Sequence, residues 1–348
     1  MEWKILKRPK NFSGYLFVIF TVFMISPIIS QETSSGKDHQ YSLPPQITLL
    51  GEISNQSLIQ KNPNFAQKLL RFFAGNRSPA LIKPFNLAVT QEGVIYVLDQ
   101  GAQTIKMINP EQTEIKDLEL EKPIKFPSPV GICLDKNGQL YWTDSQLGHI
   151  YSWKPGSKEV TIFSKGVELL RPTGIAYSSV TDEFWVVESE AHRISIFDTA
   201  GNRIRTLGTR GKGPGEFNFP VFIWIDAFGH AYVVDSMNFR VQVFDSSGAL
   251  LSTFGEIGDA TGYFARPKGI ATDSDGHIYV VDALFHTVQV FDINGKFLAN
   301  FGVHGNKEGE FWLPTGIFID PHDRIYIADS YNQRIQIYKY TSGEKDEY

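Results

Sequence analysis

The sequence predicts an all-β fold, a six-bladed β-propeller in which each blade contains four strands. Two repeated features predict it. The first is a strand-like tetrapeptide that ends in an acid and recurs every 44 to 47 residues, with the acids at Asp99, Asp144, Glu188, Asp235, Asp282 and Asp329. The second is a proline before an apolar stretch, at Pro84, Pro129, Pro172, Pro220, Pro267 and Pro314. Repeats of this period are typical of propellers and solenoids, and six four-stranded sheets around one axis leave no long exposed sheet edge.

Residues 1–30 have the layout of an export signal. A basic stretch precedes an apolar run, residues 15–29, which is shorter than the roughly 20 residues that cross a bilayer as a helix. We therefore predict a signal peptide, with an uncleaved membrane anchor as the alternative, followed by a polar linker over residues 31–45. Both alternatives place the rest of the chain outside the cytoplasm, in the periplasm or the extracellular space.

Residues 46–83 are predicted to contain one strand and one short helix that belong to the propeller. The sixth repeat has only three strands before the charged tail, residues 341–348, so its fourth strand must come from elsewhere. The stretch QITLLGE, which begins at residue 46, resembles the fourth strands of other repeats, and we expect it to complete the last blade. Asn62 as cap, Pro63 at the first helical position and Gly75 past the end predict the helix, which we expect to pack on the flank of the ring.

Residues 84–340 contain the six repeats, and the fifth shows their pattern best. KGIAT, HIYVVD, TVQVF and KFLANFG read as four strands, and Asp-x-x-Gly and Asn-Gly supply tight turns. The third residue of each innermost strand is glycine in four repeats; the six residues are Asn86, Gly131, Gly174, Phe222, Gly269 and Gly316. We expect these glycines to leave an unobstructed rim around the central channel.

The composition excludes several classes of protein. The chain is 42% hydrophobic and 13% aromatic, which is typical of a folded protein with a large core. Its one cysteine, Cys133, rules out an intrachain disulfide and a cysteine-based zinc site, and its apolar strand predicts an inert thiol. The net charge is −5, and because residues 1–30 carry +3, the remainder carries −8, which argues against a nucleic-acid binder.

The repeats resemble those of the NHL family. The stretch LPTGIFIDPHDRIYIADSYNQRIQIY in the last repeat follows the family pattern closely, and the resemblance covers residues 84–340. Three positions depart from the pattern, namely Asn86, Glu188 and Phe222. With the export signal, the closing strand and the predicted helix, the chain is similar to the exported six-bladed propellers of bacteria. This resemblance implies the propeller fold and does not imply one activity.

The most site-like residues fall in loops that a propeller gathers on one face. Long inter-blade loops cover residues 208–220, 255–267 and 302–314, and shorter loops join the second and third strands of each blade. The residues that we predict to form a binding face are Arg210, Lys212, Arg240, Arg266, His286, Trp312, Tyr331 and Arg334. The six acids that end the second strands are predicted to be structural, because Glu188, Asp235 and Asp329 each have an arginine five residues later, across a hairpin.

Two functional hypotheses follow from these residues. The first is a non-enzymatic scaffold that binds a protein or an envelope component through the loop-rich face, with no catalytic residue, metal or cofactor assigned and membrane contact only through an uncleaved N-terminal segment. The alternative is a hydrolase or lyase with a channel metal, similar to the metal-dependent lactonase and lyase propellers, for which His149, His192 and His286 are the candidate ligands. Basic residues between 192 and 212 suggest RNA, but export and the acidic balance oppose nucleic acid as a partner.

Overall fold

The computed structural model describes residues 46–54, 81–109, 114–164 and 166–342. The predicted export signal, the polar linker, the predicted helix and most of the charged tail lie outside the described residues. No helix in the described part of the chain is long and apolar enough to cross a membrane.

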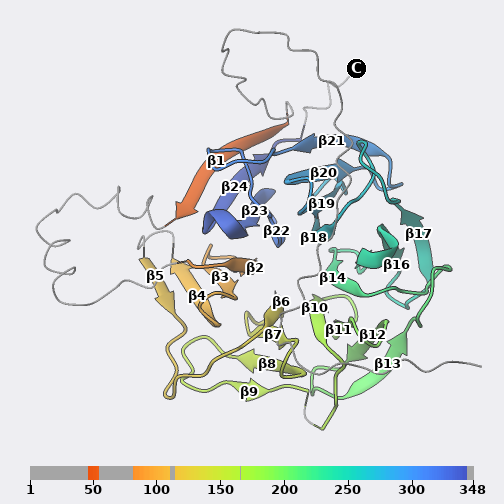
Figure 1. Ribbon diagram of the computed structural model, residues 1–348. Coiled ribbons are helices and arrows are strands. Elements are labelled where there is room, and N and C mark those ends of the chain that lie inside the picture. Colours follow the sequence, from red (N-terminus) through yellow and green to blue (C-terminus); the bar gives the residue numbers. More distant parts are fainter. Residues whose placement is uncertain (1–45, 55–80, 110–113, 165, 343–348) are drawn as a thin grey trace, which may run out of the picture. The chain divides into compact units, whose positions relative to one another are not determined.

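The propeller consists of six antiparallel sheets of four strands each, arranged as blades around a ring (Figure 1). The strands of blades 1 to 3 are, in order, β2 (Pro84–Val89), β3 (Ile95–Asp99), β4 (Thr104–Asn109), β5 (Glu114–Asp117); β6 (Pro129–Leu134), β7 (Leu140–Asp144), β8 (His149–Trp153), β9 (Thr161–Ile162); β10 (Pro172–Ser178), β11 (Glu183–Glu188), β12 (Arg193–Phe197), β13 (Arg203–Leu207). Those of blades 4 to 6 are β14 (Pro220–Ile225), β15 (Ala231–Asp235), β16 (Arg240–Phe244), β17 (Leu250–Phe254); β18 (Pro267–Thr272), β19 (Ile278–Asp282), β20 (Thr287–Phe291), β21 (Phe297–Phe301); β22 (Ile317–Ile319), β23 (Arg324–Asp329), β24 (Arg334–Tyr340) and β1 (Ile47–Ser54). The predicted propeller is confirmed.

The ring closes where the two ends of the propeller pair. β1 runs antiparallel to β24, with Ile47 opposite Tyr340 and Ser54 opposite Arg334 (Figure 1). A bulge between Leu49 and Gly51 shifts the register once within this pair, and Gly51 has a φ of +146°. The prediction that a strand from before the repeats completes the last blade is therefore confirmed, and ladder hydrogen bonds hold the circle shut.

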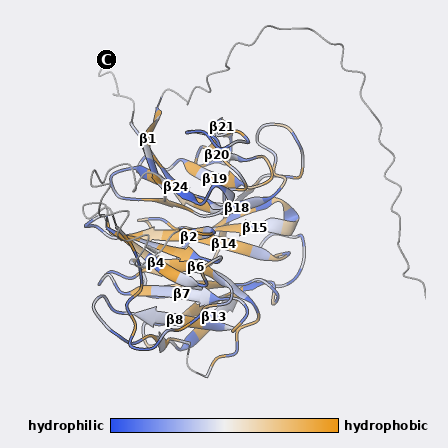
Figure 2. Cartoon of the chain, turned by 60° about the vertical axis from the view of Figure 1, so that its left-hand side comes forward, coloured by the Kyte–Doolittle hydropathy of each residue, from blue (hydrophilic) through white to orange (hydrophobic). Residues whose placement is uncertain are grey.

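The core lies between neighbouring blades. Figure 2 shows hydrophobic residues concentrated along the strands, as expected for sheets that are covered on both faces. One cluster joins blades 1 and 2 through Trp142, Tyr151 and Phe126, whose rings meet at centroid distances of 5.1 to 5.7 Å. Because the apolar surface of every blade is buried against its neighbours, the ring forms a rigid support for its loops.

The inner strands approach one another too closely for an open channel. A Cβ atom on Gly131 would collide with the carbonyl oxygen of Thr173 in the next blade, and Gly316 stands equally close to the backbone of blade 1. The rings of Phe85 and Phe222, from opposite blades 1 and 4, stack with centroids 6.0 Å apart. The prediction of an unobstructed rim is therefore wrong, because the glycines permit contact between backbones, and the two phenylalanines bridge the axis.

Candidate functional site: the loop-rich face

The loops between second and third strands and the inter-blade loops meet on one face, which we call the loop-rich face. The Tyr331 amide donates to the Trp312 carbonyl at 3.2 Å, and the Met237 amide donates to the Asn218 carbonyl at 3.1 Å. Each bond joins a hairpin loop to the inter-blade loop that leads into the same blade. The two kinds of loop therefore support each other.

The six acids at the ends of the second strands anchor these inter-blade loops. All six are fully buried, and each accepts at least one backbone N–H from the loop before its blade. The predicted arginine pairs are present as well, at 2.9 Å for Glu188 with Arg193, 2.9 Å for Asp235 with Arg240 and 2.7 Å for Asp329 with Arg334. The acids thus join each hairpin to a loop as well as bracing the hairpin itself.

Burial sets the protonation behaviour of these acids. Burial raises the pKa of Asp235 and of Asp329, even though each accepts hydrogen bonds from an arginine. At Glu188 burial also acts to raise the pKa, but hydrogen bonds from Arg193, Ser195 and the Leu170 amide outweigh it, and the pKa is lowered. All three carboxylates accept hydrogen bonds from other groups of the protein, so none of them is directed at a ligand.

Two of the predicted face residues, Arg240 and Arg334, have an internal role. The guanidinium of Arg334 donates to the carbonyls of Asn306, Lys307 and Glu310 at 2.7 to 3.0 Å and pairs with Glu52 of β1 at 2.6 Å. The guanidinium of Arg240 holds the loop before blade 4 in the same way, through the carbonyls of Lys212, Gly213 and Glu216 at 2.8 Å. The side chain of Arg334 is only 6% exposed and that of Arg240 only 12%, so little of either is available to a partner.

Buried phenylalanines fix the long loops from beneath. Phe217, Phe264 and Phe311 are fully buried, and each makes a parallel β-bridge to a residue seven positions earlier in its loop. Gly302 packs against the Phe311 ring with a φ of +92°, a conformation that favours glycine. The long loops are therefore packed structures on a rigid ring.

A cluster of exposed aromatic side chains stands on these loops, close to one lysine. Trp312 and Tyr331 are 45% and 49% exposed, and their ring centroids are 5.6 Å apart. His304 lies 6.2 Å from Trp312, and the Lys83 ammonium lies 5.6 Å from the centre of the Tyr331 ring, within the range of a cation–π contact. We call these four residues the aromatic patch.

The remaining predicted face residues occupy separate places. His286 lies 4.5 Å from His304, and its Nδ1 atom accepts the Leu313 amide at 3.0 Å, while burial and the neighbouring His304 lower its pKa. Arg210 and Lys212 are exposed on the loop before blade 4, and Arg266 is exposed on the loop before blade 5. The structure thus brings together Trp312, Tyr331 and His286 but not the cations of the prediction.

Sequence reasoning missed several cations of this face. Lys83, Arg171 and Arg266 each directly precede the proline that begins an inner strand, and of these only Arg266 was predicted. Lys268, the second residue of β18, was not predicted either. The signal that identifies them is the alignment of the residue before each proline, which is basic in alternate blades.

The three candidate metal ligands do not converge. Nδ1 of His192 accepts the Phe219 amide at 3.1 Å, just as Nδ1 of His286 accepts the Leu313 amide, whereas Nδ1 of His149 is buried without a partner. In the part of the chain that the structure describes, no three His, Cys, Asp or Glu residues are grouped so that they could hold a metal ion.

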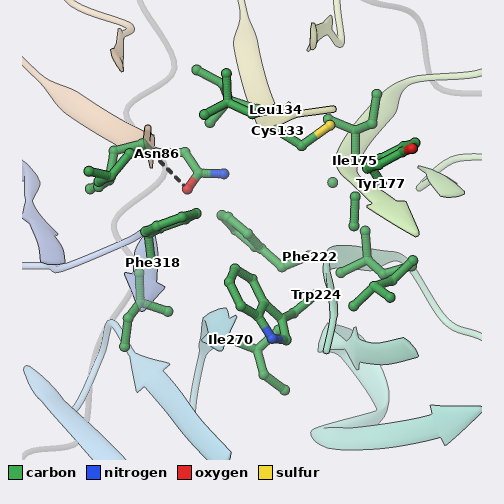
Figure 3. A pocket seen from close by; sticks show the side chains of 17 residues that line it. Asn86, Cys133, Leu134, Ile175, Tyr177, Phe222, Trp224, Ile270 and Phe318 are labelled. Atoms are coloured by element: carbon green, nitrogen blue, oxygen red, sulfur yellow. Dashed lines mark hydrogen bonds between the residues drawn. The ribbon is translucent and has the colours of Figure 1, made fainter. Parts of the chain in front are cut away.

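Below the bridging phenylalanines the axis contains a cavity of about 180 Å³. Phe222, Trp224 and Phe318 point into it, and Asn86 and Cys133 contribute polar atoms at its edge (Figure 3). Burial, aided by Asp135, raises the pKa of the Cys133 thiol, which therefore stays protonated and unreactive. The cavity is lined by apolar side chains together with polar backbone and side-chain atoms.

The fold defines the chain as a six-bladed β-propeller, and comparisons with known proteins agree. Residues 173–254 and 268–347 match the model of a family described as a 6-bladed beta-propeller. Among solved structures, the chain is similar to virginiamycin B lyase from Staphylococcus aureus, with a TM-score of 0.55 and 16% identity over 75% of this chain and 96% of that one.

Two proteins of Bacteroides thetaiotaomicron are also similar. One is an auxiliary nutrient binding protein, with a TM-score of 0.59 and 16% identity over 75% of this chain and 70% of that one. The other is a protein of unknown function, with a TM-score of 0.59 and 17% identity over 77% of this chain and 73% of that one. At these identities the similarity establishes the fold.

Proposed function

We propose that this protein is an exported, non-enzymatic scaffold that holds a protein or envelope component against its loop-rich face. The observation that carries the proposal is the aromatic patch, in which Trp312 and Tyr331 stand about half exposed beside Lys83. Export rests on the signal-like residues 1–30, and the resemblance to exported NHL propellers supports it.

The patch has the properties of a binding hot spot. Tryptophan and tyrosine provide a large contact area with few rotatable bonds, and they are enriched among the residues that dominate binding energy. Their loops are held by buried groups, since the Asp329 carboxylate accepts the Trp312 amide at 2.8 Å and Arg334 fixes the carbonyls below. A partner therefore meets a preorganised surface and loses little free energy in ordering it.

The shifted carboxylates and histidine of this face favour binding over catalysis. Asp235, Asp329 and His286 have shifted pKa values, but each is already hydrogen-bonded to protein groups. The fold does not choose between the two functions, because similar structures include a lyase and a nutrient binding protein. The choice rests on the side chains of the loop-rich face.

Capture from envelope extract tests the proposal. The full chain is immobilised, and the partner recovered is quantified for the wild type, Trp312→Ala and Tyr331→Ala. We expect each variant to reduce recovery about tenfold or more, the effect of losing a hot-spot aromatic.

Phe228→Ala is the matched control, because Phe228 is a 77% exposed aromatic in the turn between β14 and β15, at the opposite end of its blade from the loop-rich face. It should retain full recovery. If Trp312→Ala and Tyr331→Ala recover as much partner as the wild type and Phe228→Ala do, the loop-rich face is not the binding surface.

A further inference from the structure

Basic residues surround the axis on the loop-rich face in alternate blades. Lys83, Arg171 and Arg266 each directly precede the proline that begins an inner strand, in blades 1, 3 and 5. The same position in blades 2, 4 and 6 is uncharged and holds Ser128, Phe219 and Leu313. Equivalent positions of a closed ring lie at one height, so these three cations are spaced around the axis. Together with Lys268 we call them the cation ring.

Lys268 lies on an inner strand, directly after the proline of blade 5. As the second residue of β18, it shares its row with the inner-strand residues Phe85, Val130, Thr173, Val221 and Thr315, none of which titrates. Burial lowers the pKa of Lys268 to about 8, assisted by the positive charges of Arg266, Arg171 and Lys83. Blades 1, 3 and 5 come together only at the axis, so a side chain that feels all three cations lies at the mouth of the channel.

The cation ring has no carboxylate partners. In the described part of the chain, no ion pair within 4.0 Å joins any of the four residues to an acid, although Glu168 and Glu190 line a hollow beside Arg171. The six acids that end the second strands are buried and accept internal hydrogen bonds. The Lys83 ammonium contacts only the Tyr331 ring among the interactions that the structure shows.

Apolar rings form the floor of the mouth. The stacked rings of Phe85 and Phe222 bridge the axis at the depth of the inner strands, and 4% of Phe222 is exposed. A low-dielectric floor strengthens electrostatic attraction above it. Unpaired cations held together over such a floor, in a chain whose net charge is −5, form a site for negative charge rather than a general basic surface.

We propose that the mouth of the channel binds a small ligand with two or more clustered negative charges, carried by phosphate or carboxylate groups. Such a ligand would neutralise Lys268 and accept charge-assisted hydrogen bonds from the arginines. The inference deepens the proposed function and rests on it only in assigning the anion to the same face as the partner. Lys83 belongs to both the aromatic patch and the cation ring, so one ligand can contact both.

Calorimetric titration of the full chain with pyrophosphate and with citrate tests this site, with sucrose as the uncharged control. We expect both anions to bind with Kd at or below about 1 mM near pH 7. Lys268→Gln and Arg266→Gln should each weaken binding about tenfold. Lys268→Arg should retain it, and so should Lys154→Gln, which removes an exposed lysine after β8, at the opposite end of its blade from the loop-rich face. Preference for one anion distinguishes a phosphate from a carboxylate ligand.

The pH dependence gives a second measurement. Binding uses protonated Lys268, whose pKa in the free protein is about 8, so the affinity of the wild type should fall roughly fivefold or more between about pH 7 and pH 9.5. Lys268→Arg should remove most of this fall. The absence of binding by the wild type, or an equal loss in Lys154→Gln, would overturn the proposal.

The two proposals fail separately. If the wild type binds neither anion while Trp312→Ala still abolishes partner capture, only the anion site is wrong. If both anions bind through Lys268 but no variant affects capture, the anion site stands and the proposed partner surface is wrong.

Discussion

Blades 4 and 6 carry an arginine at the start of the third strand, where blade 5 carries Thr287. Arg334 is buried and Arg240 is mostly covered, and each is paired with an acid and donates to three loop carbonyls. The loop before blade 5 keeps the glutamine bonds that blades 4 and 6 also have. Gln289 donates to the Tyr263 carbonyl and accepts the Gly262 amide, at 2.7 and 2.8 Å, as Gln242 and Gln336 do in their own blades. Blade 5 is therefore a natural variant of the same unit without the arginine.

The cations that blade 5 does carry lie elsewhere. Arg266 and Lys268 are placed near the axis and have no carboxylate partner among the residues that the structure describes, and burial and neighbouring cations lower the pKa of Lys268. Basic residues in the same kind of repeat therefore have two different roles, and the groups that they bond to show which role each one has. An arginine whose guanidinium donates to carboxylates and backbone carbonyls fixes a loop. A cation that has only other cations nearby is available to an anion.

The largest effect should come from Arg334→Ala, which removes a loop-holding arginine. The change leaves the buried Asp329 and the partly buried Glu52 without their cation and frees three carbonyls. Breaking a buried ion pair from one side costs about 3 to 5 kcal/mol, so the free energy of unfolding should fall by that amount. Urea denaturation followed by tryptophan fluorescence provides the measurement.

Arg240→Ala is the matched variant. Arg240 lacks a second acid such as Glu52 and is slightly more exposed, so its loss should cost less than that of Arg334. A cost below about 1 kcal/mol for both would mean that the loops do not depend on these arginines.

Most of the fold could be predicted from the sequence. The period of the acids and prolines fixed the number of blades, and the missing strand of the last repeat predicted the pairing of β1 with β24. The channel could not be predicted in the same way. Glycine serves equally for open space and for close contact, and only the position of the Thr173 carbonyl beside Gly131 shows which applies.

The candidate site was predicted in part. Trp312, Tyr331 and His286 were expected on one face because hairpin and inter-blade loops leave the sheet at the same end. The bonds from Arg334 to carbonyls 24 to 28 residues away depend on the folded path of the loop, which no local pattern specifies. The cation ring was missed because blades 1, 3 and 5 each contribute only one or two ordinary basic residues, and only closure of the ring brings them together.

A smaller effect of opposite sign should follow from Lys268→Met. Methionine keeps the apolar stem but removes a charge that the folded protein disfavours, so the free energy of unfolding should rise by about 1 kcal/mol near pH 7. The folded pKa of about 8 lies below the unfolded value, so the cost of the lysine is fully present below about pH 8. The wild type should regain stability as the pH rises from about 8 to 10, and the two proteins should converge.

Thermal denaturation of both proteins across this pH range measures the difference. A Lys268→Met protein that is less stable than the wild type at about pH 7 would show that the ammonium has a stabilising partner, and the division between paired and unpaired cations would fail at its central residue.

The smallest effect should come from Arg266→Gln. Arg266 is exposed, and the structure shows bonds from its backbone to Asp282 and Ala283 but no ion pair from its guanidinium. Removing an exposed cation without a partner changes stability by about 0.5 kcal/mol or less, and glutamine keeps the backbone bonds. Urea denaturation beside Arg240→Ala makes the contrast direct, since both variants remove one arginine from the same face. A loss from Arg266→Gln that matches the loss from Arg240→Ala would mean that both arginines hold loops, and an unpaired guanidinium would then be no guide to a ligand site.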